Sequence, residues 1–443
     1  MHSLLSKKKL TSFQFIILGF AGMIVLGTLL LMAPISSRSG QVTPLMDALF
    51  TATSAVCVTG LILHDTATYW SAFGQAVILA LIQIGGMGVI TVTAFFAMVS
   101  GRKISLLQRS TMQEAISAPK VGGIVRLTGF IVRITLLLEL TGAAVMAPVF
   151  CRDFGAKGLW MALFHAVSAF CNAGFDLMGV RAPFSSLTSY AADPVITLTV
   201  MSLIVIGGIG FLTWDDIRAN KLHLHHYRMQ SKVILCTTAV LLILPALFFY
   251  FFEFAGLSPK ERLLASLFQA VTPRTAGFNT ADLTALSEPG QLITILLMLI
   301  GGSPGSTAGG LKTTTIAVLF TTAISTFRRR EYANFFGRRI DDDVVKNAAT
   351  ILLLYLTLSI GGGLVISLTE GLPMLTCLFE AASAMGTVGL SLGITPTLHL
   401  PSRIILILLM FMGRVGGLTL IFAAVSGTQM RVSKLPRDKI TVG

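Results

Sequence analysis

One short phrase occurs four times in this chain, and this repetition constrains the fold more than any other feature. Each copy begins with an apolar Leu-Phe-x-Ala segment, continues through a hydroxyl residue and ends in a glycine. Repeats at a nearly fixed period are typical of stacked or ring-like architectures. In an apolar chain, four such units predict a ring of four loops around one hole. The glycines, which lie 114, 103 and 112 residues apart, are Gly60, Gly174, Gly277 and Gly389, and the hydroxyl residues are Ser54, Ser168, Thr272 and Ser383.

The composition places most of the chain in a membrane. Hydrophobic residues make up 54% of it and charged residues only 12%, whereas soluble domains contain about 25% charged residues. A window of about 20 apolar residues is long enough to cross a bilayer. The first window is too long for the apolar region of a signal peptide, and no clear cleavage site follows it. We expect eight spans, at roughly 12–34, 73–99, 127–149, 194–213, 232–254, 289–325, 348–369 and 402–425.

The net charge of +13 is unevenly distributed along the chain. With the N-terminus inside, 22 of the 33 Lys and Arg fall in cytoplasmic segments and seven on the opposite side. This positive-inside bias predicts a multi-pass membrane protein with both termini in the cytoplasm. A basic inner face suits anionic membrane lipid or an acidic partner protein. The charge is therefore explained without a nucleic-acid partner.

A short apolar helix is expected before each loop glycine. These segments are only about 11 to 14 residues long, which suits a re-entrant helix and not a crossing. Irregular backbone at membrane depth is tolerated only where protein buries it or water reaches it. We therefore expect an all-α integral membrane protein in which four span–pore helix–loop–span repeats surround one pore with pseudo-fourfold symmetry. The short helices are expected near 45–56, 158–169, 259–271 and 373–384, and the repeats at 1–100, 101–220, 221–330 and 331–443, the last with a cytoplasmic tail.

A second glycine signature follows each loop in the same order. Its first glycine lies 25, 33, 24 and 24 residues after the loop glycine. Close helix packing would explain any one of these glycines alone. The ordered set favours true repeats. The signatures are Gly85-Gly86-Met87-Gly88, Gly207-Gly208-Ile209-Gly210, Gly301-Gly302 and Gly413-Arg414-Val415-Gly416.

The loop residues have the chemistry to hold a dehydrated cation. Backbone carbonyls from four loops can replace a hydration shell, and glycine adopts backbone angles that other residues avoid. A short helix that points its C-terminal end at the cavity adds a favourable negative potential. The loops contain no ring of carboxylates, and each has one glycine, which predicts a short filter built from carbonyls. The candidate ion-binding residues are Val58, Thr59, Gly60, Asn172, Ala173, Gly174, Thr275, Ala276, Gly277, Thr387, Val388 and Gly389.

The third signature expands into an interruption of its span. An unbroken helix over 289–325 would be about 55 Å long, against a hydrocarbon core of about 30 Å. Glycine, proline and serine at 301–310 predict a break, which is either a gate or a passive kink. The segment nearly imitates a phosphate-binding loop, but Leu311 breaks the spacing and nucleotide binding is rejected. The candidate gating residues are Gly301, Gly302, Ser303, Pro304, Gly305, Ser306, Thr307, Ala308, Gly309 and Gly310, with Lys312 and Arg414.

Two of these gating residues carry a positive charge. Arg414 lies near the middle of an otherwise uncharged span, where a charge costs several kcal/mol unless it faces water or a partner. We expect it to face the pore and to form a barrier to cations. The alternative is an ion pair with Glu139 or Glu380. Lys312 is expected to extend its ammonium group to the cytoplasmic interface.

Other polar residues are weaker candidates. Arg274 precedes the third loop and either braces it or lies at the surface. His399 has no partner nearby in the sequence. The five cysteines form no CxxC pair, and three clustered histidines in a basic link lack a carboxylate or cysteine, so no metal site or other cofactor is expected in this chain. Four polar residues lie on the short helices, namely Asp47, His165, Gln269 and Glu380. They either support the loops or attract cations at the mouth of the pore, and the alternative is a plain capping or packing role.

The chain resembles the Trk/Ktr/HKT superfamily of cation transporters over nearly its whole length. It is most similar to the membrane subunit of bacterial Ktr potassium uptake systems. The resemblance rests mainly on the segments 269–279 (QAVTPRTAGFN) and 82–86 (IQIGG) and on Gly413-Arg414-Val415-Gly416. It implies a bacterial plasma membrane location and an intramembrane gate at 301–310. In this family a serine in place of the first loop glycine accompanies sodium transport, so Gly60 implies potassium as the transported ion.

The same resemblance implies partners that the residues alone do not reveal. It implies a homodimer docked on a cytosolic ring of RCK-type regulatory subunits that bind the nucleotide, and stimulation by Na⁺. Two other functions are weighed against the channel-like translocator. An intramembrane protease would need a serine paired with a histidine on a neighbouring span, and no such motif is present. A secondary carrier often has inverted repeats, whereas these repeats all begin and end inside.

Overall fold

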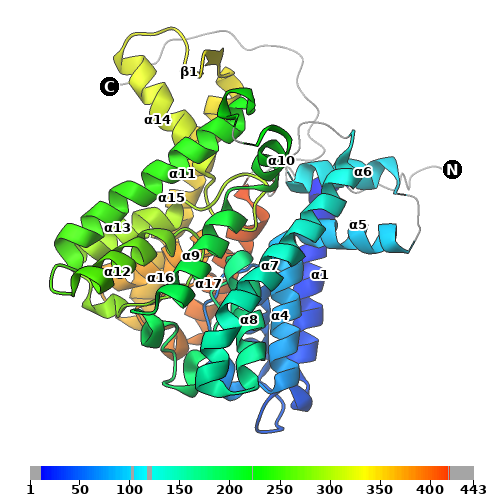
Figure 1. Cartoon of the computed structure of the whole chain (residues 1–443), viewed down its shortest axis with the longest axis vertical. Coiled ribbons are helices and arrows are strands. Elements are labelled where there is room, and N and C mark those ends of the chain that lie inside the picture. Colours follow the sequence, from blue (N-terminus) through cyan, green and yellow to red (C-terminus); the bar gives the residue numbers. More distant parts are fainter. Residues whose placement is uncertain (1–10, 101–103, 117–121, 222, 418, 420–443) are drawn as a thin grey trace, which may run out of the picture.

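The computed structural model describes residues 11–100, 104–116, 122–221, 223–417 and 419, and this part of the chain is mostly helical (Figure 1). The helices are α1 (Ser12–Met32), α2 (Leu45–Val56), α3 (Thr66–Tyr69), α4 (Ala72–Met87), α5 (Val89–Val99), α6 (Leu106–Ile116), α7 (Ile124–Phe154), α8 (Lys157–Phe170), α9 (Pro194–Gly208), α10 (Phe211–Asn220), α11 (Met229–Phe248), α12 (Pro259–Val271), α13 (Glu288–Leu299), α14 (Thr313–Phe327), α15 (Asp342–Glu370), α16 (Met374–Gly386) and α17 (Leu400–Val415). Shorter turns are η1 (Pro34–Ser36), η2 (Met178–Val180), η3 (Thr188–Tyr190), η4 (Leu224–His226), the π-helical η5 (Phe249–Glu253), η6 (Leu283–Ala285) and η7 (Thr395–Thr397).

The order of the helices repeats four times. A long helix is followed by a short one, by a loop glycine and by a further helix, which carries the second signature in repeats 1, 2 and 4 and ends just before it in repeat 3. The short helices α2, α8, α12 and α16 have 12 to 14 residues, as re-entrant segments should. Within the described residues, the helices long and apolar enough to cross a membrane alone are α1, α7, α11 with η5, and α15, or up to six spans if each bent pair counts as one.

Apolar side chains cover the outside of the long helices. Leu29, Leu244, Leu353 and Leu368 are between 62% and 77% exposed. Exposed apolar surface on this scale marks a face that contacts another apolar phase. The long helices therefore have the outward surface of a protein embedded in lipid.

Two of the expected spans, 73–99 and 194–213, are bent. The axes of α4 and α5 differ by 96°, as do those of α9 and α10. The breaks occur at Gly88 and Gly210, whose φ angles are +85° and +91°. Glycine adopts such angles without a Cβ penalty, and it therefore ends a helix sharply. Gly416, with φ of +90°, ends α17 in the same way, and most of 418–425 lies outside the described residues.

The expected break in 289–325 is present. Helix α13 ends at Leu299 and α14 begins at Thr313. The backbone between them bonds to the neighbouring repeat: the Ser303 N–H donates to the Gly208 carbonyl at 2.9 Å. The Phe211 N–H in turn donates to the Gly305 carbonyl at 2.8 Å. These bonds satisfy backbone groups that apolar surroundings would leave unpaired, so the irregular segment is stable there.

One short β-hairpin occurs in the otherwise helical part of the chain that the structure describes. A two-stranded antiparallel hairpin, β1 (Asn334–Phe335) and β2 (Arg338–Arg339), follows α14. The turn residues Phe336 and Gly337 have φ angles of +49° and +78°. Positive φ at both central residues is the geometry that a two-residue hairpin requires. Figure 1 shows β1 at the same end of the molecule as α6 and α10.

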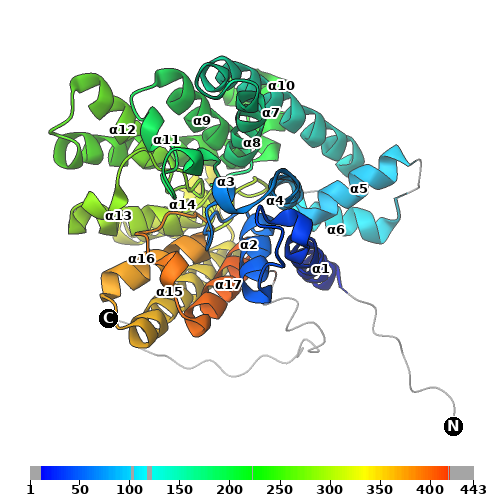
Figure 2. The same cartoon turned by 90° about the horizontal axis from the view of Figure 1, so that it is seen from below.

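The first and last repeats lie side by side and complete the bundle. Figure 2 shows α2 beside α17, and these helices are in contact. Arg403 on α17 donates from Nη1 to Asp47 Oδ1 on α2 at 3.1 Å. The second oxygen of Asp47 lies 2.8 Å from His64 Nε2. Asp47 therefore joins repeat 4 to repeat 1, and the expectation that it attracts cations gains no support from this placement.

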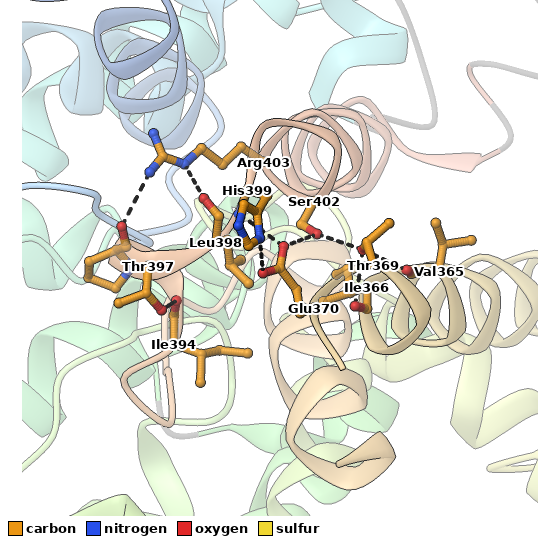
Figure 3. Close-up of polar contacts among 11 residues, drawn as sticks. Val365, Ile366, Thr369, Glu370, Ile394, Thr397, Leu398, His399, Ser402 and Arg403 are labelled. Carbon is orange, nitrogen blue, oxygen red and sulfur yellow. Dashed lines mark hydrogen bonds and ion pairs between the residues drawn. The ribbon is translucent and has the colours of Figure 1, made fainter. Parts of the chain in front are cut away.

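A polar cluster next to this seam fixes the end of α15 (Figure 3). Glu370 accepts hydrogen bonds from the His399 N–H at 2.9 Å and from the Ser402 hydroxyl at 2.5 Å. The His399 ring approaches the same carboxylate through Nδ1 at 2.7 Å. His399 has a partner after all, because the fold brings together residues 29 positions apart.

Candidate functional site

The candidate site is formed by the four segments 58–60, 172–174, 275–277 and 387–389, which we call the glycine loops. All four have the same unusual backbone. Their first residues Val58, Asn172, Thr275 and Thr387 have φ of +51°, +56°, +68° and +53°, and their glycines have φ of +91°, +69°, +81° and +92°. Left-handed angles at residues other than glycine cost about 1–3 kcal/mol each, and they persist only where the surroundings enforce them. Because left-handed backbone angles alternate with ordinary ones along each glycine loop, successive carbonyl oxygens point toward the same side.

The last turn of each short helix holds its glycine loop through one repeated bond. The N–H of the middle loop residue donates to the carbonyl of the shared hydroxyl residue. The pairs are Thr59 with Ser54, Ala173 with Ser168 and Val388 with Ser383, each at 2.8 Å, and Ala276 with Thr272 at 3.0 Å. This bond uses the amide of the middle residue and leaves its carbonyl oxygen free.

The hydroxyl side chains hold the loops in more than one way. The Gly60 N–H donates to the Ser54 hydroxyl and the Gly389 N–H to the Ser383 hydroxyl, both at 3.0 Å. In repeat 3 the Thr272 hydroxyl donates to the Phe278 carbonyl. In three of the four repeats the hydroxyl at this position therefore orients the loop, whereas the buried Ser168 hydroxyl has no hydrogen-bond partner within the described residues.

The glycine loops contact one another in a closed ring. A Cβ built on Gly60 would lie 2.5 Å from the Ala173 carbonyl oxygen, and one on Gly174 would lie 2.8 Å from that of Ala276. A Cβ built on Gly277 would lie 2.2 Å from the Val388 carbonyl oxygen, and one built on Gly389 would lie 2.2 Å from the Thr59 carbonyl oxygen. Each loop meets the next, and the last returns to the first. Any side chain at these positions would collide with a backbone carbonyl, so only glycine allows the ring.

The second signature packs against the short helices. A Cβ on Gly85, Gly207 or Gly413 would lie 2.1 Å from the carbonyl oxygen of Val56, Phe170 or Met385 respectively. These carbonyls belong to the last turn of the short helix in the same repeat. In repeat 3, Gly301 faces the Gly309 oxygen instead, at 2.3 Å. Close packing, the alternative interpretation of these glycines, is therefore what they provide.

Arg414 binds backbone carbonyls instead of a carboxylate. Its guanidinium donates to the carbonyls of Thr307 and Gly85, and to that of Gly86 at 3.0 Å. The alternative of an ion pair with Glu139 or Glu380 is wrong. Those two carboxylates have other partners, Gln83 at 3.1 Å for the first and the hydroxyls of Ser391 and Thr395 at 2.5 and 2.8 Å for the second. Arg414 thus fastens the 301–310 segment to α4.

Lys312 also binds this segment. Its ammonium group donates to the carbonyls of Ala308 at 2.8 Å and Gly309 at 3.2 Å. It does not extend away to an interface as expected. Lys312 and Arg414 line one cavity of about 250 Å³ together with Glu114 and Tyr355. Two cationic groups therefore face the space beside the 301–310 segment.

The polar residues of the short helices mostly support the loops. The ring of His165 accepts the Leu177 N–H at 3.3 Å, and Glu380 accepts the Leu392 N–H at 3.1 Å. Both acceptors bind the third residue after a loop glycine. Gln269 donates to the Thr294 hydroxyl at 3.5 Å. Arg274 is buried, so the interpretation as a surface residue is wrong, and its carbonyl accepts a bond from Asn172.

One contact of the candidate site has no counterpart among the expectations drawn from the sequence. Asn172 reaches both the third glycine loop and Thr307 of the 301–310 segment. The first residues of the other glycine loops are Val58, Thr275 and Thr387. The side-chain amide at position 172, which those three residues lack, is the one sequence feature that could have indicated this contact. Within the described residues, no group of three or more His, Cys, Asp or Glu side chains is placed to hold a metal ion.

Long apolar helices, short re-entrant helices and a closed ring of loops define a multi-pass membrane transport protein. Residues 5–434 match the TrkH family model, described as a cation transport protein, and the chain belongs to this family. It is 40% identical to the potassium/sodium uptake protein NtpJ of Enterococcus hirae over 99% of this chain and 98% of that protein. It is 37% identical to the Ktr system potassium uptake protein B of Bacillus subtilis over 97% of this chain and 96% of that one.

The fold also matches a solved structure. The potassium transporter TrkH from Vibrio parahaemolyticus superposes with a TM-score of 0.74 at 20% identity, over 97% of this chain and 88% of that one. At that identity the likeness concerns the fold alone. Membership of a transporter family excludes the intramembrane protease weighed above, and the chain is not an enzyme.

Proposed function

We propose that this chain is the channel-like potassium-translocating subunit of a Ktr-type uptake system. The observation that carries the proposal is the closed ring in which each loop glycine faces the carbonyl of the next loop. Such rings of carbonyl oxygens replace the hydration shell of a cation. The names of two relatives, a potassium/sodium uptake protein and a Ktr potassium uptake protein, support the same ion class. K⁺ is the favoured ion because all four loops have glycine at the third position.

The ion would bind to the backbone of the glycine loops. The middle carbonyls lie nearest the neighbouring loops, and the repeated left-handed residues align the carbonyls before and after them. The C-terminal ends of four short helices add a negative potential in the same region. The proposed ion-binding residues are Val58, Thr59, Gly60, Asn172, Ala173, Gly174, Thr275, Ala276, Gly277, Thr387, Val388 and Gly389.

The 301–310 segment, with Lys312 and Arg414, would gate this path. It lies against the ends of three glycine loops and is held there by Arg414. Two positive side chains in one cavity oppose the entry of a cation, whereas a passive kink would need neither. Displacing the segment would open the path.

The wider architecture follows from the repeats. We assign them to 1–100, 101–220, 221–330 and 331–443, arranged with pseudo-fourfold symmetry around one pore. The basic links near α6, α10 and β1 gather at one end of the molecule, which supports a bacterial plasma membrane protein with both termini in the cytoplasm (Figure 1). A homodimer docked on a cytosolic, nucleotide-binding RCK-type ring, with stimulation by Na⁺, completes the proposal. In this proposal the chain itself binds no cofactor, and the nucleotide binds to the partner subunit.

Radioactive rubidium uptake into proteoliposomes that hold the purified protein tests this proposal. We expect uptake that K⁺ blocks and Na⁺ affects little, and a Gly60→Ser variant in which the preference for K⁺ over Na⁺ falls. Absence of cation flux, even after a regulatory ring is added, would overturn the proposal. Rubidium uptake that requires the gradient of a second ion, with a fixed number of those ions moved per rubidium ion, would favour the secondary carrier instead.

A further inference from the structure

The 301–310 segment touches three of the four glycine loops, each at its first residue. The Thr307 hydroxyl lies 3.0 Å from Asn172 Oδ1. A Cβ built on Gly309 would lie 2.2 Å from the Thr387 hydroxyl, and one on Gly301 would lie 3.1 Å from the Thr275 methyl group. The segment therefore does more than lie in the path of an ion. It braces the loops that would select that ion.

Asn172 makes the most specific of these contacts. Its buried side chain donates from Nδ2 to the Arg274 carbonyl and to the Thr275 hydroxyl, both at 3.3 Å. The Arg274 carbonyl can only accept, so the amide nitrogen points there and the amide oxygen points to Thr307. The side chain of one glycine loop thus holds the next loop and the 301–310 segment at the same time.

Thr307 continues this connection in the other direction. Its hydroxyl lies 3.0 Å from both Asn172 Oδ1 and the Phe170 carbonyl at the end of α8. Its own carbonyl accepts from Arg414, which also binds Gly85 and Gly86. The Thr307 hydroxyl shares its one proton between these two acceptors, and Thr307 therefore connects Arg414, through its carbonyl, to Asn172 and two of the glycine loops, through its hydroxyl.

The backbone of Asn172 is left-handed, like that of the first residue in each of the other glycine loops. Its φ of +56° lies in a region that residues other than glycine rarely occupy, although asparagine tolerates it better than most. Cation discrimination by carbonyls depends on the number and arrangement of the oxygens around the ion. Loosening Asn172 would therefore make both its own loop and the Thr275 loop less strict.

We propose that Asn172 is a positioning residue that makes ion selectivity depend on the 301–310 segment. With the segment in place, Thr307 fixes the Asn172 amide, and the amide fixes the second and third glycine loops. When the segment moves, Thr307 leaves, and the ring discriminates less well between K⁺ and Na⁺. This inference rests on the proposed function and adds a link between gate and selectivity that the blocking role alone does not contain.

A Thr307→Val variant tests the link, because valine keeps the shape and removes the hydroxyl. The readout is the Na⁺ concentration that halves rubidium uptake divided by the corresponding K⁺ concentration. We expect this ratio to fall about fivefold, the effect of losing one neutral hydrogen bond. Thr307→Ser restores the hydroxyl and should restore the ratio.

Thr313→Val is the matched control. Thr313, the first residue of α14, is as buried as Thr307, and within the described residues its hydroxyl bonds to the Ser303 hydroxyl at 3.1 Å and to no glycine loop. Its loss should leave the ratio unchanged, whatever it does to the rate. Asn172→Ala should lower the ratio at least as far as Thr307→Val, and adding the second substitution to the first should lower it no further.

The outcomes separate the two proposals. A wild-type protein without K⁺-blocked uptake overturns both. A selective wild type with an unchanged ratio in Thr307→Val and Asn172→Ala overturns the coupling alone. An equal fall in Thr313→Val also overturns it, because the effect would then follow from general loosening of the segment. If Thr307→Val is not monodisperse after purification, Thr307→Ala replaces it, because alanine also removes the hydroxyl that contacts Asn172.

Discussion

Gly389 of the last glycine loop faces the carbonyl oxygen of Thr59 in the first, and this contact closes the ring. A Cβ on Gly389 would lie 2.2 Å from that oxygen, which is shorter than any real contact of a methyl group. Thr59 and Gly389 lie far apart in the sequence, and the fold brings them into contact. The Arg403–Asp47 pair holds the same two repeats together at the edge of the bundle, at 3.1 Å.

Gly389→Ala should therefore abolish selective uptake. The added methyl group must displace the Thr59 carbonyl or its own loop, and either shift removes a ligand from the ring. Gly393→Ala is the control, because Gly393 has nearly the same φ, +88° against +92°, and nothing within 4 Å of its Cβ position. It should lose about 1 kcal/mol of stability from the left-handed backbone and keep uptake. Rubidium uptake that is equal in the two variants would contradict the ring.

Arg414→Gln should raise the rate of K⁺ uptake. The substitution removes a charge from the cavity and weakens the bonds to Thr307 and Gly85, each worth about 1.5–3 kcal/mol for a charged donor. A change of this size alters the open fraction on the order of tenfold. Arg152→Gln, which removes an exposed charge paired with Asp153, should leave the rate alone. Initial rates in proteoliposomes measure both, and a rate unaffected by Arg414→Gln would count against the barrier.

Asp176→Asn should flatten the pH dependence of stability. Burial raises the pKa of Asp176 from 3.8 to about 7; the bond from the Met178 N–H opposes the rise, and the nearby Asp65 adds to it. The folded protein thus binds more protons than the unfolded one between these values, and stability falls as pH rises from about 4 to about 7. Thermal midpoints across this range should show a smaller fall in Asp176→Asn. Asp343→Asn, at a side chain 89% exposed, should keep the wild-type slope.

Glu370→Gln should destabilise the bundle without changing selectivity. The carboxylate is 5% exposed and accepts from Ser402 and from the His399 N–H, and it also faces the His399 ring. The amide can keep one oxygen for the Ser402 hydroxyl and the His399 N–H, but it loses the charge of the acceptor, and hydrogen bonds to a charged group contribute about 1.5–3 kcal/mol. Glu261→Gln is the control, since its bond to the Ser258 hydroxyl is exposed. Equal thermal midpoints for the two variants would refute the structural role of the cluster.

The features that sequence reasoning predicted correctly are local ones. The break at 301–310 follows from glycine and proline in a segment too long for one crossing, and the short helices follow from the length of their apolar runs. Both depend on neighbouring residues in the chain. The bends at Gly88 and Gly210 were missed because a glycine permits a positive φ without requiring it. At Gly210 the 301–310 segment of the neighbouring repeat leaves no room for a side chain, since a Cβ there would lie 2.7 Å from the Pro304 carbonyl oxygen.

The candidate site shows the same division. The glycine loops were recognisable because four copies carry the same phrase, and Arg414 because a charge in an apolar span is costly. The partners of Arg414 could not be predicted, because they are the backbone carbonyls of Thr307 and Gly85, and every residue has such a carbonyl. Asn172 looked equivalent to Val58, and its contact with Thr307 joins residues 135 positions apart.

The order of the residues is enough to predict an apolar chain with four repeats and a glycine loop in each. The length of the apolar runs, the repeated glycines and the placement of the charges can all be read from the residues. Packing in three dimensions establishes that each loop glycine meets the carbonyl of the next loop, that Gly389 meets Thr59, and that Thr307 links Arg414 to Asn172. Those relationships arise from packing between distant segments, where backbone atoms common to every residue supply the contacts.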